Sequence, residues 1–166
     1  MSFGKRIATA AATFLMVLTV GILSACVDGQ TSQISSAADE DAIRRMATQY
    51  TQAVEKADLE KFLSFYADSI VVMPPGQPVM RGRQAAKAFA EPLFDQFVMQ
   101  ESISYDELHV DGDWAAGRFS YTFSVTPKTG GATTTERGKA MVWLKRTASG
   151  VWQFSHWIWN QDRPPA

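Results

Sequence analysis

The stretch AAGRFSYTFSVT, residues 115–126, decides the fold class, because its aromatic and aliphatic residues recur at every second position. Phe119, Tyr121 and Phe123 fall on one face of an extended chain, and small or polar residues fall on the other. Such alternation is typical of a strand with one face buried. Residues 133–146 and 151–160 alternate in the same way, and Gly-containing turn signals separate the segments. The C-terminal half is therefore predicted to be an antiparallel sheet.

The N-terminal half has a different period. Before Gln100, the apolar residues recur at helical spacing, and Asp58 is a plausible N-cap. Pro92 lies inside the third helical pattern and is expected to kink or split that helix. The expected elements are three helices, over 39–57, 58–66 and 84–96, and two further strands, over 70–73 and 103–110. Helices followed by a run of antiparallel strands predict an α+β fold.

The first 26 residues have the pattern of an export signal. Lys5 and Arg6 precede an apolar stretch, 7–23, whose dense part is too short for an ordinary transmembrane span. Leu-Ser-Ala-Cys at 23–26 resembles the bacterial lipobox, in which Cys26 becomes the lipidated first residue of the mature chain. We expect a lipoprotein signal peptide over 1–25. The alternatives are a plain secreted protein or an uncleaved anchor.

The segments that flank the expected domain are short and polar. Residues 26–38 are predicted to form a flexible tether, followed by one folded domain over 39–160 and a tail over 161–166. The expected location is the bacterial cell envelope, anchored by lipid on Cys26. Val27 after the cysteine favours the periplasmic side of the outer membrane, and the protein would be secreted if Cys26 is not lipidated.

Composition excludes several classes of function. A chain of 166 residues fits one domain, and a net charge of -1 argues against nucleic acid as a partner. One cysteine excludes an intramolecular disulfide and a cysteine-cluster metal site, and two histidines leave little for zinc. We expect no metal and no cofactor.

Six motifs in order resemble the NTF2-like superfamily, in its SnoaL-like and DUF4440 branch. They are the segments 50–59, 65–68, 74–76 and 81–83, continued by 112–115 and 152–156. The resemblance covers nearly the whole expected domain. It implies a cone in which a strongly curved antiparallel sheet wraps the N-terminal helices and leaves a pocket at the open end. It also implies dimers formed through the outer sheet face. The superfamily spans isomerases, dehydratases, hydrolases and members without known chemistry, so the fold alone does not give the function.

The resemblance allows a test for ketosteroid isomerase chemistry, which needs a carboxylate base, a tyrosine and a protonated acid. Tyr50 falls at the position of the catalytic tyrosine. The base would fall at Met73 or Pro74 and the acid near Met141, and none of these side chains transfers a proton. That mechanism is therefore not expected. Tyr50 is either a hydrogen-bond donor in the pocket or a core aromatic residue with a satisfied hydroxyl.

The last strand carries the other candidate residues. If this strand alternates strictly, His156 lies on the face that the resemblance places in the pocket. The His156 side chain would there act as a general acid or base, or it would have a structural role. Trp157 and Trp159 would then lie on the outer face and form a dimer interface, unless the third helix or the tail covers them. The remaining ligand-binding candidates are Tyr66, Met73, Trp114, Tyr121, Met141, Trp143, Phe154 and Asn160.

Three functions follow from these expectations. The first is a lipid-anchored domain that binds a small, mostly apolar ligand, with Tyr50, His156 and Asn160 as polar contacts. The second is an enzyme of isomerase or hydrolase type that uses His156 and Tyr50. The third is a dimeric assembly or accessory protein with a vestigial pocket.

Overall fold

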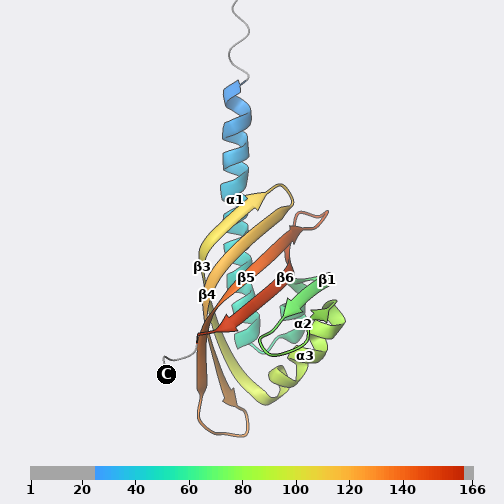
Figure 1. Ribbon diagram of the computed structural model, residues 1–166, viewed down its shortest axis with the longest axis vertical. Helices are drawn as coiled ribbons and strands as arrows, with labels where there is room; N and C mark the ends of the chain where they lie inside the picture. The colour runs from blue at the N-terminus through green and yellow to red at the C-terminus, as the bar shows by residue number, and fades with distance from the viewer. Residues whose placement is uncertain (1–24, 163–166) are drawn as a thin grey trace, which may run out of the picture. The chain divides into compact units, whose positions relative to one another are not determined.

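The computed structural model describes residues 25–162, with side chains described from Ser36 onward. The chain from Ile34 onward forms a compact unit that holds the whole sheet. The helices are α1 (Ala25–Glu55), α2 (Leu59–Ser64) and α3 (Arg83–Gln96). The strands are β1 (Tyr66–Met73), β2 (Met80–Arg81), β3 (Phe97–Asp111), β4 (Trp114–Pro127), β5 (Thr134–Arg146) and β6 (Trp152–Gln161). The α+β prediction is confirmed (Figure 1).

The six strands form one sheet in the order β2-β1-β6-β5-β4-β3. β3 to β6 pair with their sequence neighbours as the alternation predicted, but β1 lies parallel to β6. The sheet is therefore mixed, and this parallel pair adds to the antiparallel sheet that the resemblance implied. A parallel pair needs a long connection between its strands, and here α3 and three intervening long strands provide it.

The second and third helices begin where capping and spacing predicted. The Asp58 side chain accepts a hydrogen bond from the Lys61 amide at 2.9 Å and so caps α2. α3 stays continuous through Pro92, so the predicted split is wrong. Pro92 has no amide hydrogen, so the carbonyl of Ala88 loses its usual partner in the helix. Both residues are exposed, so water can replace the lost hydrogen bond. The opposite face of α3 buries Ala86, Ala90 and Phe94.

The first helix is longer than predicted. α1 begins at Ala25, so residues 26–38, predicted to be a flexible tether, are helical in the described chain. This stretch contains no proline, and Gly29 is its only strong helix breaker. Within residues 25–162 no helix is both long and apolar enough to cross a bilayer. The predicted signal peptide lies outside the described residues except for Ala25.

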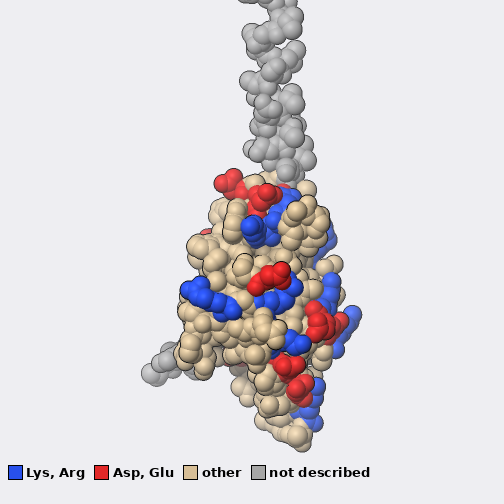
Figure 2. All heavy atoms as spheres, turned by 90° about the vertical axis from the view of Figure 1, so that its right-hand side faces the viewer, with Lys and Arg blue, Asp and Glu red and all other residues tan. Residues whose placement is uncertain are grey.

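The helices cover the concave face of the sheet and enclose an aromatic core (Figure 1). The Tyr50 ring of α1 is central to this core. Its centroid lies 5.2 Å from that of Trp157, 5.6 Å from that of Phe154 and 5.1 Å from that of Phe62. Acidic and basic side chains alternate over the face shown in Figure 2, without a patch of one sign.

Candidate functional site

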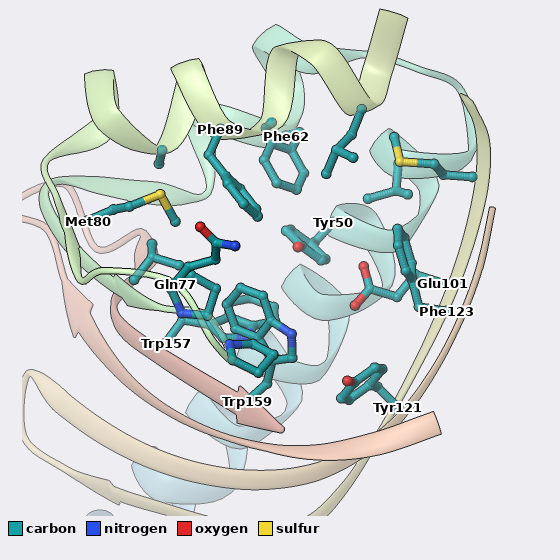
Figure 3. Close-up of a pocket in the computed structure, with 18 of the residues that line it drawn as sticks. Tyr50, Phe62, Gln77, Met80, Phe89, Glu101, Tyr121, Phe123, Trp157 and Trp159 are labelled. Carbon is teal, nitrogen blue, oxygen red and sulfur yellow. The ribbon is translucent and has the colours of Figure 1, made fainter. Parts of the chain in front are cut away.

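A cavity of about 340 Å³ opens between the concave face of the sheet, α1 and α3 (Figure 3). Most of its lining is apolar. The residues that bring polar atoms to it are Tyr50, Tyr66, Gln77, Glu101, Tyr121, Glu136 and Gln161, besides the two indoles. A cavity of this size and composition suits a small, mostly apolar molecule oriented by a few hydrogen bonds.

The last strand does not alternate strictly, and this changes which of its residues reach the cavity. Phe154 pairs with Leu144 but His156 pairs with the next residue, Trp143, so Ser155 is an extra residue in β6. Such a β-bulge reverses the inward and outward phase of the residues that follow it. Beyond Ser155, the inward positions are therefore Trp157 and Trp159.

Two predicted placements are overturned by this bulge. Trp157 and Trp159 line the cavity, and Trp157 is only 5% exposed, so neither lies on the outer face as predicted for a dimer interface. His156 lies on the outer face. Its Nδ1 is 3.0 Å from the Ser155 hydroxyl, and its ring meets that of Trp143 edge-on at 5.0 Å. His156 is therefore not among the residues that line the cavity.

The structure divides the other predicted ligand-binding residues into two groups. Tyr50, Tyr66 and Tyr121 line the cavity as expected. Phe154 is fully buried in the core and Met73 lies outside the lining. The residues whose side chains are exposed elsewhere on the sheet are Trp114, Met141, Trp143 and Asn160. These four were expected in the cavity because outward positions of β4, β5 and β6 were assigned to the inner face.

Glu101 was not among the residues predicted from the sequence, although its carboxyl group points into the cavity (Figure 3). It lies on β3, which begins at Phe97 rather than at Ile103 as predicted. Extending the alternation of Ile103 and Tyr105 backwards by one step would have placed Glu101 on the inner face. Burial, and to a smaller extent the negative charge of Glu136, raise the pKa of Glu101 to about 8. At neutral pH the group is therefore mostly protonated and close to the range useful for proton transfer.

A second carboxylate, Glu136, lies across the sheet from Glu101 and is held by donors. Glu101 pairs with Phe123 on β4, and Phe123 pairs with Glu136 on β5, so the three side chains form a row on the inner face. The Tyr121 hydroxyl donates to Glu136 Oε1 at 3.2 Å, and Gln161 Nε2 donates to Glu136 Oε2. Glu136 thus has two partners that fix its orientation at the edge of the cavity.

Gly138 allows this arrangement. A Cβ added there would lie 2.1 Å from the Asn160 carbonyl oxygen and 2.7 Å from the Tyr121 ring. Only a residue without a side chain lets the Tyr121 ring lie against β5 and place its hydroxyl at Glu136.

Tyr50 presents its hydroxyl to the cavity beside Glu101 (Figure 3). Burial is the main reason that the pKa of Tyr50 lies well above its usual value, and the charge of Glu101 and the hydroxyl of Tyr66 act in the same direction. Burial also raises the pKa of Tyr66. Both phenols therefore remain protonated and can donate hydrogen bonds to a ligand.

The side chains at the positions expected for the ketosteroid isomerase base and acid bring no proton-transferring group to the cavity. Pro74 lines the cavity where the base would lie, and Met141, near the expected position of the acid, is 52% exposed on the outer face. Glu101 instead brings a carboxyl group from a different strand. Among the described residues, no three His, Cys, Asp or Glu side chains come together in a way that could hold a metal ion.

Residues 47–152 match the family model of the SnoaL-like domain. The chain belongs to the SnoaL-like family. Its fold is that of the NTF2-like superfamily. No functionally curated protein matches the sequence.

Several solved structures share this fold. A conserved protein from Planctomyces limnophilus DSM 3776 is 26% identical, with a TM-score of 0.71 over 76% of this chain and 99% of that one. A ketosteroid isomerase-like protein from Erwinia carotovora atroseptica SCRI1043 is 24% identical, with a TM-score of 0.65 over 75% and 96%. An NTF2-like superfamily protein from Salmonella enterica serovar Typhimurium LT2 is 15% identical, with a TM-score of 0.66 over 78% and 95%.

Proposed function

We propose that this SnoaL-like domain binds a small, mostly apolar ligand in its cavity. The observation that carries the proposal is the cavity itself, about 340 Å³ in volume and lined by aromatic side chains with a few inward polar groups. Tyr50 remains a polar contact of this proposal, and Glu101 takes the place of His156 and Asn160, because Tyr50 and Glu101 both point into the cavity.

Native mass spectrometry of the full chain in neutral nanodiscs tests the binding proposal. We expect the purified protein to carry an additional small-molecule mass. Tyr50→Phe and Glu101→Gln should reduce that occupancy, whereas Glu91→Gln, an exposed change on α3, should not. A chain that carries no additional mass, and takes up none from an organic extract of its host cells, would contradict the proposal.

A second candidate is an acid–base enzyme of isomerase type, favoured by the raised pKa of Glu101 beside the protonated Tyr50. In this reading the Glu101 carboxylate removes a proton from carbon next to a carbonyl group, and Tyr50 donates a hydrogen bond to the resulting enolate oxygen. Glu101 then returns the proton to a different carbon of the same molecule, so the double bond moves and the atoms balance.

Deuterium incorporation from heavy water into a β,γ-unsaturated cyclohexenone, followed by NMR, tests the enzyme candidate. We expect Glu101→Gln to abolish exchange above the solvent rate and His156→Gln to leave it intact, since His156 lies outside the cavity. Loss of exchange in His156→Gln alone would instead support His156 as the general acid or base, as predicted from the sequence.

We also propose that the domain is held at the cell envelope by lipid on Cys26, on the periplasmic side of the outer membrane. The support is the Leu-Ser-Ala-Cys pattern after a basic and apolar N-terminal segment. Labelling of cells with a radioactive fatty acid should mark the protein, and Cys26→Ser should remove the label. A labelled Cys26→Ser chain, or an unlabelled parent chain, would contradict this assignment.

A homodimer through the outer sheet face is the third part of the proposal. Four apolar side chains on that face are between 45% and 52% exposed, namely Trp114, Met141, Trp143 and Ile158. Apolar surface that is contiguous across neighbouring strands is typical of an interaction site. Trp143 pairs with both Ala116 and His156, and Met141 pairs with Ile158, so the patch spans β4 to β6. This face replaces Trp157 and Trp159 as the expected interface.

A further inference from the structure

The charged groups of the cavity all have the same sign. Its lining contains two carboxyl groups, Glu101 and Glu136, and no lysine, arginine or histidine among the residues that the structure describes. A negative field in an apolar enclosure disfavours an anionic ligand, because nothing in the lining offsets the repulsion. The same field favours a ligand that brings a positive charge.

The two carboxyl groups differ in their partners. Glu136 accepts hydrogen bonds from Tyr121 and Gln161. Within residues 36–162, no side-chain hydrogen bond and no salt bridge reaches the Glu101 carboxyl, which points into the cavity (Figure 3). An enclosed carboxylate without a partner is unfavourable, and such groups in proteins are normally paired with a cation or protonated. No described side chain therefore offsets a charge on Glu101, and a ligand in the cavity could do so.

The walls around this carboxyl group are aromatic. Tyr50 lies on one side of Glu101, Phe123 and Tyr121 lie on the other, and Trp157 and Trp159 form the wall at β6 (Figure 3). The faces of Trp, Tyr and Phe rings attract ammonium groups, and several rings around one space are the usual arrangement for binding substituted ammonium ions. Thus the aromatic surface and the carboxyl group favour the same class of ligand.

We propose that the cavity selects an organic cation, with a substituted ammonium group beside Glu101 and the aromatic walls and an apolar body directed toward α3. This inference rests on the proposed function and names the ligand class of the same cavity. The apolar body would contact Phe89 and Leu93, which α3 contributes to the lining.

The protonation of Glu101 gives this proposal a pH dependence with a definite sign. The titratable groups that act on Glu101 or line the cavity are Tyr50 on α1, Tyr66 on β1, Tyr121 on β4 and Glu136 on β5. α3 and β6 contribute no titratable side chain to the lining. A cation prefers the ionised carboxylate, so its affinity should increase as the pH rises through the pKa of Glu101.

Isothermal titration calorimetry on the full chain in phosphatidylcholine nanodiscs, with empty nanodiscs as the blank, tests the proposal. The probes are benzyltrimethylammonium, its neutral isostere neopentylbenzene, and the anion phenylacetate. A quaternary ammonium ion does not titrate, so the pH dependence of its binding reports on the protein. With a Glu101 pKa of about 8, its affinity should rise about tenfold between pH 7 and pH 9.

Variants separate the carboxyl group from the general charge of the protein. Glu101→Gln keeps the size of the side chain and should lower the affinity for the cation at pH 9 by about tenfold or more. It should also abolish the pH dependence and leave neopentylbenzene binding unchanged. Glu91→Gln changes the net charge equally on an exposed site of α3 and should have no effect. Trp159→Leu should weaken the cation more than the neutral isostere.

The outcomes distinguish this proposal from the one on which it rests. If neopentylbenzene binds as tightly as the cation at pH 9, and Glu101→Gln does not change cation affinity, the cation proposal is overturned while the apolar binding site stands. If phenylacetate binds best and weakens as the pH rises, protonated Glu101 acts as a donor and the proposal is also overturned. If none of the three probes binds, both proposals fail. Circular dichroism of each variant establishes that it is folded.

Discussion

Asp39 of α1 and Arg146 of β5 lie 107 residues apart in sequence and form a forked ion pair in the structure. Arg146 Nη1 donates to Asp39 Oδ1 at 2.7 Å, Nη2 donates to Oδ2, and the Trp152 indole N–H points at the same carboxylate from 3.4 Å. Asp39 is 8% exposed, so its charge depends on these partners. The pair ties the first helix to the far ends of β5 and β6.

Arg146→Met should therefore lower the free energy of unfolding by about 2–3 kcal/mol, because it leaves an enclosed carboxylate with one weak partner. Urea unfolding monitored by circular dichroism measures the loss. Arg45→Met changes an exposed arginine of α1, the helix that carries Asp39, and should alter the free energy of unfolding by less than about 0.5 kcal/mol. Equal effects of the two variants would show that the ion pair contributes nothing beyond charge.

Glu101 predicts a difference in stability between the parent chain and Glu101→Gln that depends on pH. Its pKa is about 8 in the folded protein against 4.5 as the ordinary value, so between these values the folded state binds a proton that the unfolded state does not. The stability that this bound proton gives to the folded state is therefore lost as the pH rises from about 4.5 to about 8. We expect Glu101→Gln to be more stable than the parent chain at pH 8.5, by an amount on the order of 2–4 kcal/mol.

The same comparison at pH 4.5 should show a much smaller difference, because the protonated carboxyl group and the amide are then similar. Urea unfolding of both chains at the two pH values measures this change. A Glu101→Gln variant that is less stable than the parent chain at pH 8.5 would mean that Glu101 is ionised and paired in solution.

Much of the fold can be predicted from residue spacing. The parts of the site that could not be predicted in this way have local structural causes. The alternation around Phe119 and the helical spacing around Tyr50 placed strands and helices correctly. One extra residue, Ser155, then reversed the face of every later residue in β6. Its trace in the sequence is the three-residue step from Phe154 to Trp157 between aromatic residues that otherwise alternate. Glu101 was missed because a charged residue on an inner face contradicts the pattern used to define a strand.

The outer face gives a third prediction. Trp143→Glu should convert a dimer to a monomer, because a charge replaces a 50% exposed aromatic ring at the centre of the apolar patch. Analytical ultracentrifugation of the full chain in a mild detergent, with the detergent contribution subtracted, measures the mass. Val151→Glu introduces the same charge at a 56% exposed residue in the turn between β5 and β6 and should leave the mass unchanged. A parent chain that is monomeric at micromolar concentration would exclude the interface.

Gly138 gives the last prediction, which links backbone geometry to the cavity. Gly138→Ala would force its methyl group against the Asn160 carbonyl oxygen and the Tyr121 ring, and backbone cannot move aside as a flexible side chain can. We expect a loss of about 2–3 kcal/mol in the free energy of unfolding, the range typical of overpacking.

A purely structural effect and an effect on the cavity can be distinguished at this position. Displacing Tyr121 removes its hydrogen bond to Glu136, so Gly138→Ala should also weaken the binding of any cavity ligand, and Tyr121→Phe should weaken it without the loss of stability. Lys139→Ala, at the next residue of β5, removes only an exposed ion pair with Asp162 and should change stability by less than about 1 kcal/mol. If Gly138→Ala is as stable as the parent chain, Tyr121 does not lie against β5 in solution, and the orientation of Glu136 must have another cause.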